Sequence, residues 1–520
     1  MLSINQTITL TCGALGADFE GICRHDGQVV FVCGALPGET VHVKIEKVGK
    51  KSAVGKLLDI VERSPERADP PCAVFPRCGG CVALHMNYQA TLRHKRQQVI
   101  DCLSRIGGIG TPDVLPVIGM ERPWWYRNKA AFPVGGSPCH PCIGCYAEHS
   151  HEIVDVKNGC LLQSESSDAL VLAVRRWMMK NAIAPYDEKN HTGLLRHIVT
   201  REAFDGGVML ILVINGTHGD RLPATEDLIA SAKDAVSNIS TNVKDAVGGF
   251  IASSKGAAGD VITDTKDPAS GLITNTNGAV GNFIANSKGA ADDRITGTKK
   301  AVPTLRSVVV CENTRRTNVI FGETFHTLWG DDVLIDEIAG FQMRVSPRSF
   351  FQVNREQAEK LFELAVSFAG LTGGERVWDV YCGCGSITLP LARKAAFVTG
   401  IEVVEDAVRD ARENALRNGV RNVSFICGAA EAILPSLAAW EGAPDVIVVD
   451  PPRKGCDEKA LAAIAAAAPA RIVYVSCNPA TLSRDVAFLS GHGYGLQRVQ
   501  PVDLFAWTGH VECVALLGRC

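Results

Sequence analysis

The residue of this chain best placed to act as a nucleophile is Cys477. It ends the apolar run Arg471-Ile-Val-Tyr-Val-Ser-Cys477 and is followed by Asn478-Pro479, which stops a strand. The carboxyl end of a buried strand in an open α/β sheet faces the crevice where ligands bind. A buried structural thiol is the competing interpretation, because free cysteine is among the most buried residue types. The neighbouring motifs favour the nucleophile.

Two carboxylates accompany this cysteine. Asp450 follows an apolar run and opens Asp450-Pro-Pro-Arg-Lys-Gly455, which we expect at the same rim of the sheet. Glu512 begins the last apolar strand, within Thr508-Gly-His-Val-Glu-Cys-Val-Ala-Leu-Leu517, and we place this strand beside that of the cysteine. A carboxylate there could act as a base. Its structural alternative is a salt bridge or a charge at the strand edge.

A glycine-rich turn, Tyr381-Cys-Gly-Cys-Gly-Ser386, follows an earlier strand. Gly383 and Gly385 let the backbone approach a cofactor closely, and Glu402 at the end of the next strand is placed to take ribose hydroxyls. S-adenosylmethionine fits better than NAD, because the full Gly-x-Gly-x-x-Gly fingerprint of dinucleotide sites is absent. Further strands alternate with helices, which predicts a doubly wound α/β sheet.

Nineteen cysteines in a chain without an export signal indicate reduced thiols, metal ligation or catalysis rather than a disulfide framework. One widely spaced group is formed by Cys72, Cys78, Cys81 and Cys160. Four thiolates suit either zinc or an iron–sulfur cluster, and the six-residue step from Cys72 to Cys78 departs from the short spacing of structural zinc sites. Both metals stay open on spacing alone.

A second group consists of Cys139, Cys142 and Cys145. It could form a second metal site, supply an alternative fourth ligand, or be unligated. Its spacing differs from the Cys-x3-Cys-x2-Cys run expected of a radical enzyme that reduces S-adenosylmethionine.

The N-terminal region has features of an RNA-binding platform. Short β-rich runs from Ile8 to about Ile60 alternate with turns at Asp26-Gly27 and Pro37-Gly38, as in a small barrel. A basic cluster near its end could bind phosphates or form a solvated face; it contains Lys44, Lys47, Lys50, Lys51 and Lys56.

Two further segments combine basic residues with a helix or with aromatic residues. We expect a basic helix from Tyr88 to Ile106, and an aromatic–basic strand at Trp124-Trp-Tyr-Arg-Asn-Lys129. The second segment could stack unpaired bases or pack in the core.

Residues from about 237 to 302 contain a repeat, in which Phe250-Ile-Ala-Ser-Ser-Lys-Gly-Ala-Ala258 recurs as Phe283-Ile-Ala-Asn-Ser-Lys-Gly-Ala-Ala291. We interpret this segment as a peripheral insert, because loop-closure cost grows only slowly with length. Joining its flanks would leave an ordinary helix-to-strand connection.

The length of 520 residues predicts two or three domains. The net charge of −3 argues against a uniformly basic RNA-coating surface but permits a local basic patch. The N-terminus lacks a basic and then apolar signal, and no apolar stretch is long enough to span a bilayer. We expect a cytoplasmic (cytosolic) monomer.

Four motifs, taken together, resemble those of the RNA (uracil-5-)-methyltransferases in order and spacing. They are Tyr381-Cys-Gly-x-Gly385, Asp450-Pro-Pro-Arg-Lys-Gly455, Val475-Ser-Cys-Asn-Pro-Ala-Thr-Leu-x-Arg484 and Gly509-His-Val-Glu512. The barrel resembles a TRAM domain, and the widely spaced cysteines resemble the iron–sulfur ligands of the 23S ribosomal RNA branch. Cys384 in the glycine turn and the second cysteine group depart from the family pattern.

The resemblance implies a Rossmann-like S-adenosylmethionine-dependent methyltransferase domain, preceded by an OB-like TRAM barrel and a central α+β RNA-binding region. The implied boundaries are 1–62, 63–350 with the insert at about 237–302, and 351–520. The resemblance makes Cys477 the nucleophile, Glu512 the base and Asp450 a catalytic group. The cofactor and uracil pocket would contain Gln352, Tyr381, Gly383, Gly385, Glu402 and Asp450, and a [4Fe-4S] cluster would be held by Cys72, Cys78, Cys81 and Cys160.

The expected reaction is methylation of carbon 5 of a loop uridine, with 23S ribosomal RNA as the expected substrate, through a covalent adduct with Cys477. Uracil carbon 5 is a weak nucleophile until a thiolate adds to carbon 6, and a loop base leaves its stack most cheaply. Three alternatives stay open: the T-loop uridine of transfer RNA, amino-group methylation at Asp450-Pro-Pro-Arg453, and a non-catalytic metal–sulfur RNA-binding protein.

Overall fold

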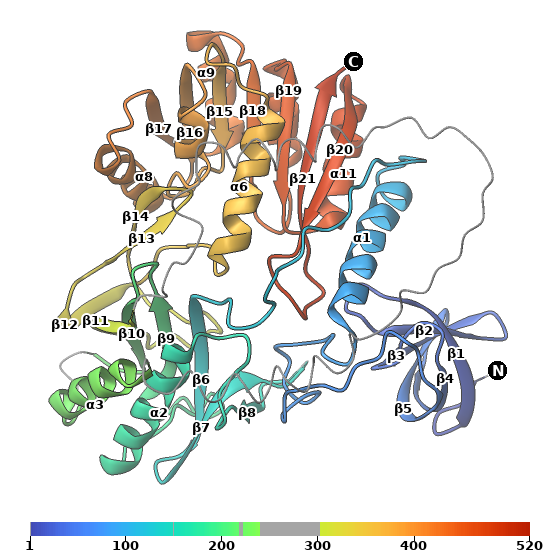
Figure 1. The fold of residues 1–520 in the computed structure, drawn as a ribbon, viewed down its shortest axis with the longest axis vertical. Coiled ribbons are helices and arrows are strands. Elements are labelled where there is room, and N and C mark those ends of the chain that lie inside the picture. The colour runs from blue at the N-terminus through green and yellow to red at the C-terminus, as the bar shows by residue number, and fades with distance from the viewer. Residues whose placement is uncertain (1, 149, 218–221, 240–301) are drawn as a thin grey trace, which may run out of the picture.

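The computed structural model describes residues 2–148, 150–217, 222–239 and 302–520. Figure 1 shows a small barrel, a central sheet and a C-terminal sheet, with helix α1 between the barrel and the C-terminal sheet. The predicted insert lies almost entirely outside the described residues. Helix α3 (Thr225–Ser237) precedes the insert and strand β11 (Thr304–Glu312) follows it, as the predicted helix-to-strand connection requires. Within the described ranges, no helix is long and apolar enough to cross a membrane.

The N-terminal strands close into a barrel in the order β1-β2-β3-β5-β4. They are β1 (Thr7–Leu15), β2 (Gly21–His25), β3 (Gln28–Cys33), β4 (Thr40–Val48) and β5 (Ser52–Glu62). Alternate residues point inward, so that Val41, Val43 and Ile45 of β4 pack in the interior. Both residues of the Asp26-Gly27 turn have positive φ, as this two-residue hairpin requires. The predicted barrel is confirmed.

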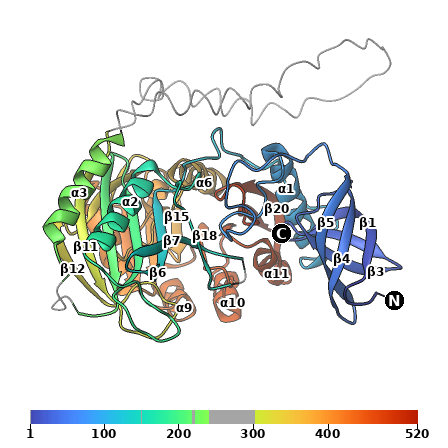
Figure 2. The same ribbon diagram turned by 90° about the horizontal axis from the view of Figure 1, so that it is seen from below.

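Helix α1 (Tyr88–Arg105) agrees with the predicted basic helix. The side chain of Asn87 caps it by accepting a hydrogen bond from the backbone N–H of Ala90. Val99 and Leu103 pack in the core of the C-terminal sheet. Figure 2 shows from below that α1 also lies next to the barrel. The helix therefore connects two parts that are far apart in the sequence.

The central sheet has the strand order β12-β11-β10-β9-β6-β7-β8. Its strands are β11, β12 (Thr324–Gly330), β6 (Lys129–Ser137), β7 (His140–Tyr146), β8 (Ile153–Asp155), β9 (Leu195–Glu202) and β10 (Gly207–Ile214). Every residue of β10 is buried, because α2 (Glu165–Lys180) and α3 cover one face and aromatic side chains and a hairpin cover part of the other. That hairpin consists of β13 (Leu334–Ile338) and β14 (Phe341–Val345).

The predicted aromatic–basic strand at Trp124–Lys129 is largely wrong. Strand β6 begins only at Lys129, and the preceding residues form bends with a positive φ at Trp125. Trp124 stacks on Trp507 with ring centroids 4.6 Å apart, and both rings belong to a small apolar cluster. Tertiary packing between two loops determines this segment, and the local sequence pattern did not reveal those contacts.

The C-terminal sheet has the strand order β17-β16-β15-β18-β19-β21-β20. Its strands are β15 (Arg376–Val380), β16 (Phe397–Glu402), β17 (Val423–Cys427), β18 (Val446–Val449), β19 (Arg471–Ser476), β20 (Tyr494–Val502) and β21 (Glu512–Arg519). Those from β15 to β19 pair in parallel, and β21 is antiparallel to both of its neighbours. The predicted Rossmann-like sheet is confirmed.

Helices cover both faces of this sheet, which explains its unbroken apolar strands. One face packs against α6 (Arg355–Ala369), α7 (Thr388–Ala392) and α8 (Glu405–Arg417). The other face packs against α1, α9 (Ala430–Glu441), α10 (Glu458–Ala466) and α11 (Pro479–Ser490). Because the helices cover the faces of the sheet, polar side chains of the loops that follow the strands can form a site at the sheet edge.

Candidate active site

The topology of the C-terminal sheet brings the predicted site residues to one edge. Parallel strands β16, β15, β18 and β19 end there together. Glu402 ends β16, Tyr381 and Asp450 follow β15 and β18, and Cys477 follows β19. Because β21 runs the opposite way, its first residue, Glu512, lies at the same edge.

Cys477 and Glu512 are neighbours across two adjacent strands. Ser476 of β19 pairs with Cys513 of β21 in the antiparallel register. Cys477, which follows Ser476, therefore lies opposite Glu512, which precedes Cys513. The prediction that the last strand lies beside the Cys477 strand is confirmed. A half-buried thiol and a carboxylate with 6% exposure thus share one position at the sheet edge.

The surroundings of Cys477 keep its thiol protonated in the free protein. Burial raises the pKa of Cys477 to about 11, and the nearby Glu512 acts in the same direction, while Arg453 opposes them. Asn478 caps the N-terminus of α11, so the thiol also lies at the positive end of a helix. Generating a thiolate here requires a proton acceptor or a polarising ligand.

The two carboxyl groups have raised pKa values. Burial raises the pKa of Glu512 to about 8, with Asp450 adding to the shift and Arg453 opposing it. Burial raises the pKa of Asp450 itself to about 7. A carboxylate with a pKa near 8 accepts a proton more readily than an ordinary one, so Glu512 has the properties of a general base.

The glycine turn after β15 holds an unusual backbone conformation. Tyr381 has a φ of 69°, and Gly383 and Gly385 have φ values of 55° and 87°. Glu402 stabilises the turn, because its side chain accepts hydrogen bonds from the backbone N–H groups of Gly383 at 3.2 Å and Val404 at 2.9 Å. Glu402 and the glycine turn are therefore in contact. The sequence predicted that both would bind a nucleoside cofactor.

The loop between β14 and α6 carries Gln352 and is held by residues of the central sheet. Asn128 donates to the backbone carbonyl of Gln352 at 3.0 Å, and the buried Arg201 donates to the carbonyls of Pro347 and Ser349. Phe350 in this loop is 76% exposed, although it is a large apolar residue. We call residues 346–354 the Gln352 loop; it is held from the central sheet and presents an exposed ring.

The segment before Glu512 is fixed by helix α1. The ammonium group of Lys95 lies 2.6 Å from a carboxylate oxygen of Asp503, and both side chains are fully buried. Tyr88 donates to the same carboxylate at 2.7 Å, and Lys95 also donates to the carbonyl of Phe505. These contacts hold the strand and loop that lead to the candidate base.

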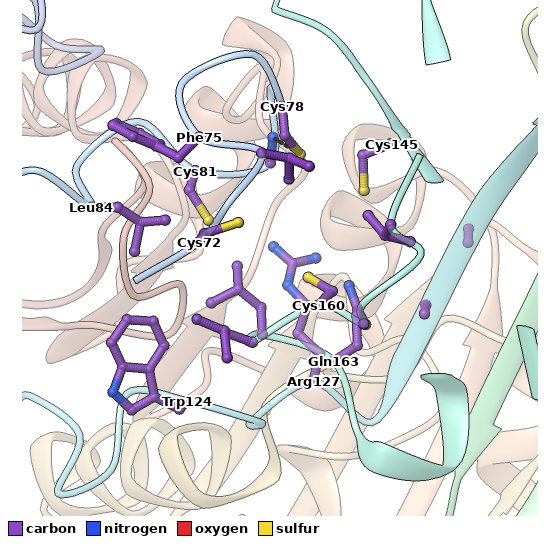
Figure 3. A pocket seen from close by; sticks show the side chains of 18 of the residues that line it. Cys72, Phe75, Cys78, Cys81, Leu84, Trp124, Arg127, Cys145, Cys160 and Gln163 are labelled. Atoms are coloured by element: carbon purple, nitrogen blue, oxygen red, sulfur yellow. Dashed lines mark hydrogen bonds between the residues drawn. The ribbon is translucent and has the colours of Figure 1, made fainter. Parts of the chain in front are cut away.

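The four widely spaced cysteines lie together around a cavity of about 290 Å³. Figure 3 shows their thiols entering from loops on different sides, together with that of Cys145. Burial alone would lower the pKa of Arg127, but Tyr126, Cys160 and Cys81 raise it. Arg127 is therefore the cation that interacts with these thiols.

The second cysteine group is divided by the structure. Cys139 is exposed, and Cys142 donates to the carbonyl of Ile153. Cys145 lines the cavity, and a hydrogen bond from its thiol lowers the pKa of Cys78 to about 6. Only one member of this group therefore joins the widely spaced set.

The thiol arrangement does not match a site for one metal ion. In the described part of the chain, no three Cys, His, Asp or Glu side chains are grouped so that they could hold such an ion. The thiols line one cavity instead.

Three residues near the site were not singled out by sequence reasoning. Asp379 is fully buried beside the glycine turn; it accepts from Thr388 at 2.5 Å, and its other carboxylate oxygen has no partner. Arg453 was quoted only as part of a motif, yet its charge acts on both Cys477 and Glu512. Phe350 is the exposed ring of the Gln352 loop. Its position two residues before Gln352 was the signal that could have identified it.

Comparisons with known proteins agree with this architecture. A family model described as tRNA (Uracil-5-)-methyltransferase matches residues 325–520, and a TRAM domain model matches residues 3–58. An uncharacterized RNA methyltransferase of Halalkalibacterium halodurans is 40% identical over 513 residues, which cover 99% of this chain and 97% of that protein. Another, of Caldanaerobacter subterraneus, is 40% identical over 519 residues, covering 100% and 99%.

The fold is also found in a solved structure. The Pyrococcus abyssi tRNA (uracil-54, C5)-methyltransferase in complex with S-adenosyl-L-homocysteine superimposes with a TM-score of 0.69 and 24% identity, covering 98% of this chain and 99% of that one. Full-length relatives at 40% identity and the two matching family models lead to one conclusion. This chain belongs to the RNA (uracil-5-)-methyltransferase family.

Proposed function

We propose that this enzyme transfers a methyl group from S-adenosylmethionine to carbon 5 of a uridine in 23S ribosomal RNA, through a covalent adduct with Cys477. The observation that carries the proposal is the pairing of β19 with β21, which puts a thiol and a buried carboxylate with a pKa of about 8 at one point of the sheet edge. Carbon-5 methylation needs one group that adds to the ring and a second group that later removes a proton.

The steps assigned to the protein begin with Cys477. A proton acceptor first takes the proton of the thiol; the sulfur then forms a bond to carbon 6, and the ring electrons move to the carbonyl oxygen at carbon 4 to give an enolate. Bound S-adenosylmethionine supplies the methyl group that carbon 5 receives. Glu512 then takes the proton from carbon 5, the carbon 5–carbon 6 double bond forms again, and the sulfur leaves with its electron pair. Asp450 lies at the same edge and can hydrogen-bond the ring while it carries charge.

The cofactor is assigned to the part of the sheet edge where β15 and β16 end. Glu402 is placed for the ribose hydroxyls, and the turn at Gly383 and Gly385 allows close approach of the backbone. The unpartnered oxygen of Asp379 gives this region a buried acceptor. Gln352 and Phe350 approach from the Gln352 loop, where an exposed ring suits stacking on the target base.

A [4Fe-4S] cluster is proposed for the cysteine cavity, with Cys72, Cys78, Cys81 and Cys160 as its ligands. A cubane cluster takes one thiolate at each iron, so its ligands enclose a volume instead of meeting at one ion. The four thiols line one cavity of about 290 Å³, which supports a cluster at this place. Its role is to order the surrounding loops, since methyl transfer moves no electrons to a metal.

The substrate RNA has two candidates. The TRAM barrel and the cysteine set support ribosomal RNA through the resemblance of their motifs. The second candidate is the T-loop uridine of transfer RNA, which is favoured by the matching family model, described as tRNA (Uracil-5-)-methyltransferase, and by the substrate named for the Pyrococcus abyssi protein.

One experiment separates these candidates. The protein is incubated with labelled S-adenosylmethionine and unmodified 23S ribosomal RNA or transfer RNA, and the modified nucleotide is mapped. We expect 5-methyluridine in the ribosomal RNA. Label in transfer RNA alone would select the second candidate, and label on an exocyclic amino group, retained by Cys477→Ser, would overturn the uracil mechanism.

A further inference from the structure

A second cavity lies beside the Gln352 loop and has a cationic lining. It has a volume of about 380 Å³ and is lined by Lys129, Arg348 and the residues Ala131, Val319, Ile320 and Phe321. Lys129 and Arg348 are the charged groups among these lining residues, and the other walls are apolar. We call this cavity the Lys129 pocket.

The positive charge of the Lys129 pocket is not balanced within the described part of the chain. No carboxylate there forms an ion pair with Lys129 or Arg348. Arg201, with 4% exposure, lies directly opposite Lys129 in the β6–β9 pairing, which brings two like charges together. Such an arrangement is costly unless an anion offsets it.

The environment of Lys129 shows the same imbalance. Burial, together with the charge of Arg201, lowers the pKa of its ammonium group to about 8. The amine lies 5.6 Å from the centre of the Phe321 ring, which is a weak favourable contact for a cation. The cation is therefore held in a partly desolvated place that a bound anion would stabilise.

Hydrogen bonds connect the segments that line the Lys129 pocket to the Gln352 loop. Asn128, the residue before Lys129, donates to the carbonyl of Gln352. Arg201 donates to the carbonyls of Pro347 and Ser349, which flank Arg348. The groups that line the pocket thus belong to the same segments that hold Gln352 and the exposed Phe350.

We propose that the Lys129 pocket binds a backbone phosphate of the substrate RNA near the target uridine. Lysine and arginine are the side chains that bind phosphates most strongly, and contacts to phosphates fix the position of a nucleic acid without reading its sequence. A phosphate held here would place the displaced base at the Gln352 loop. This inference rests on the proposed function only in taking RNA as the substrate.

The cysteine cavity offers Lys129 a different role, because Lys129 and Ala131 also line that cavity. Lys129 could there balance the charge of the thiolates. The charge of Arg127, however, is the one that acts on Cys81 and Cys160. Because Arg127 is the cation that acts on these thiols, Lys129 is available for a separate anion.

The salt dependence of RNA binding tests the proposal. Binding of an unmodified RNA hairpin with a uridine-containing loop is measured without S-adenosylmethionine, for the wild type, Lys129→Met and Arg348→Gln. Each loss of a phosphate contact should reduce the slope of log K against log salt by about 0.7–1. The control, Lys394→Met, changes an exposed lysine before β16, at the opposite edge of the sheet, and should keep the wild-type slope.

A second measurement identifies the phosphate itself. Hairpins carrying one neutral methylphosphonate at successive positions are bound to the wild type and to Arg348→Gln, an exposed site where folding is not at risk. One position should weaken wild-type binding several-fold and have a smaller effect on the variant. An unchanged salt slope in both variants, or equal methylphosphonate penalties in wild type and variant, overturns the proposal. Both measurements report RNA binding and do not depend on methyl transfer. Failure of the proposed reaction is therefore recognised separately, by mapping the modified nucleotide.

Discussion

Cysteine is the main functional residue of both the sheet-edge site and the cysteine cavity, but different kinds of structure position it in the two places. Cys477 is positioned by regular structure, because it follows a buried parallel strand and precedes a capped helix. The cavity cysteines lie instead in loops whose approach depends on packing between distant segments. The first site needs one thiol in a defined direction, whereas the second needs several thiols around a volume.

The difference also affects what each thiol can do. At the sheet edge, burial raises the pKa of Cys477, and Glu512 and Asp450 add to the shift, so the thiol holds its proton until a substrate enters. In the cavity, a hydrogen bond from Cys145 lowers the pKa of Cys78, whereas burial raises the pKa of Cys160 to about 11 and raises that of Cys81 as well. The thiols of the cavity therefore differ among themselves, and those with a raised pKa must lose their protons when they ligate a metal.

Replacing Cys477 gives the largest expected effect and tests the sheet-edge side of this comparison. Cys477→Ser should reduce methylation by about 10⁴-fold or more, because a serine hydroxyl is a far weaker nucleophile at neutral pH. The measurement is label transfer under single-turnover conditions. Cys427→Ser is the matched control, since Cys427 is an exposed thiol that ends the parallel strand β17 of the same sheet. Equal loss in both variants would remove the special role of Cys477.

Glu512→Gln should give the next largest effect. Losing a general base typically costs about 10²–10⁴-fold in rate, and the loss should fall on the step after methyl transfer. The methylated RNA then stays bonded to Cys477 and migrates with the protein on a denaturing gel. Normal turnover without such an adduct would show that Glu512 is not the base.

The regular parts of this comparison could be predicted from sequence. Apolar runs, glycine turns and the acids that end strands were sufficient to predict the doubly wound sheet and the place of its last strand. These predictions succeed because sheet topology turns a position in the sequence into a position in space. Once β19 and β21 pair, Cys477 and Glu512 have little freedom to be elsewhere.

The loop-built parts could not be predicted in this way. Cys145 was grouped by spacing with Cys139 and Cys142, but the alternation along β7 and the approach of the Cys78 loop separate them. Trp124 was assigned to a strand, yet it stacks on Trp507, which lies far along the sequence. No local pattern encodes such contacts, since they arise only when distant loops pack together.

The cavity side is tested by a pair of cysteine variants. Cys81→Ala should lose most of its iron and lower the free energy of unfolding by about 3 kcal/mol or more, because the free energy of metal binding adds to that of folding. Cys139→Ala, which changes an exposed thiol of the other group, should change neither. The measurements are iron per chain and denaturant unfolding. Equal iron content in the two variants would contradict a cluster in this cavity.

The smallest expected effect is a pH dependence confined to the sheet edge. Burial raises the pKa of Glu512 to about 8, so below that pH the carboxyl group holds a proton and cannot accept another from carbon 5. Release of the methylated RNA should therefore accelerate as pH rises, by about tenfold from pH 7 to above pH 9, because about one carboxyl in ten is ionised at pH 7 when its pKa is 8. Cys477 cannot cause this change, since its sulfur is already bonded to the ring when release is timed. Quench-flow measurement of adduct decay would show the rise in the wild type and its absence in Glu512→Gln. A flat profile in the wild type would mean that another group accepts the proton.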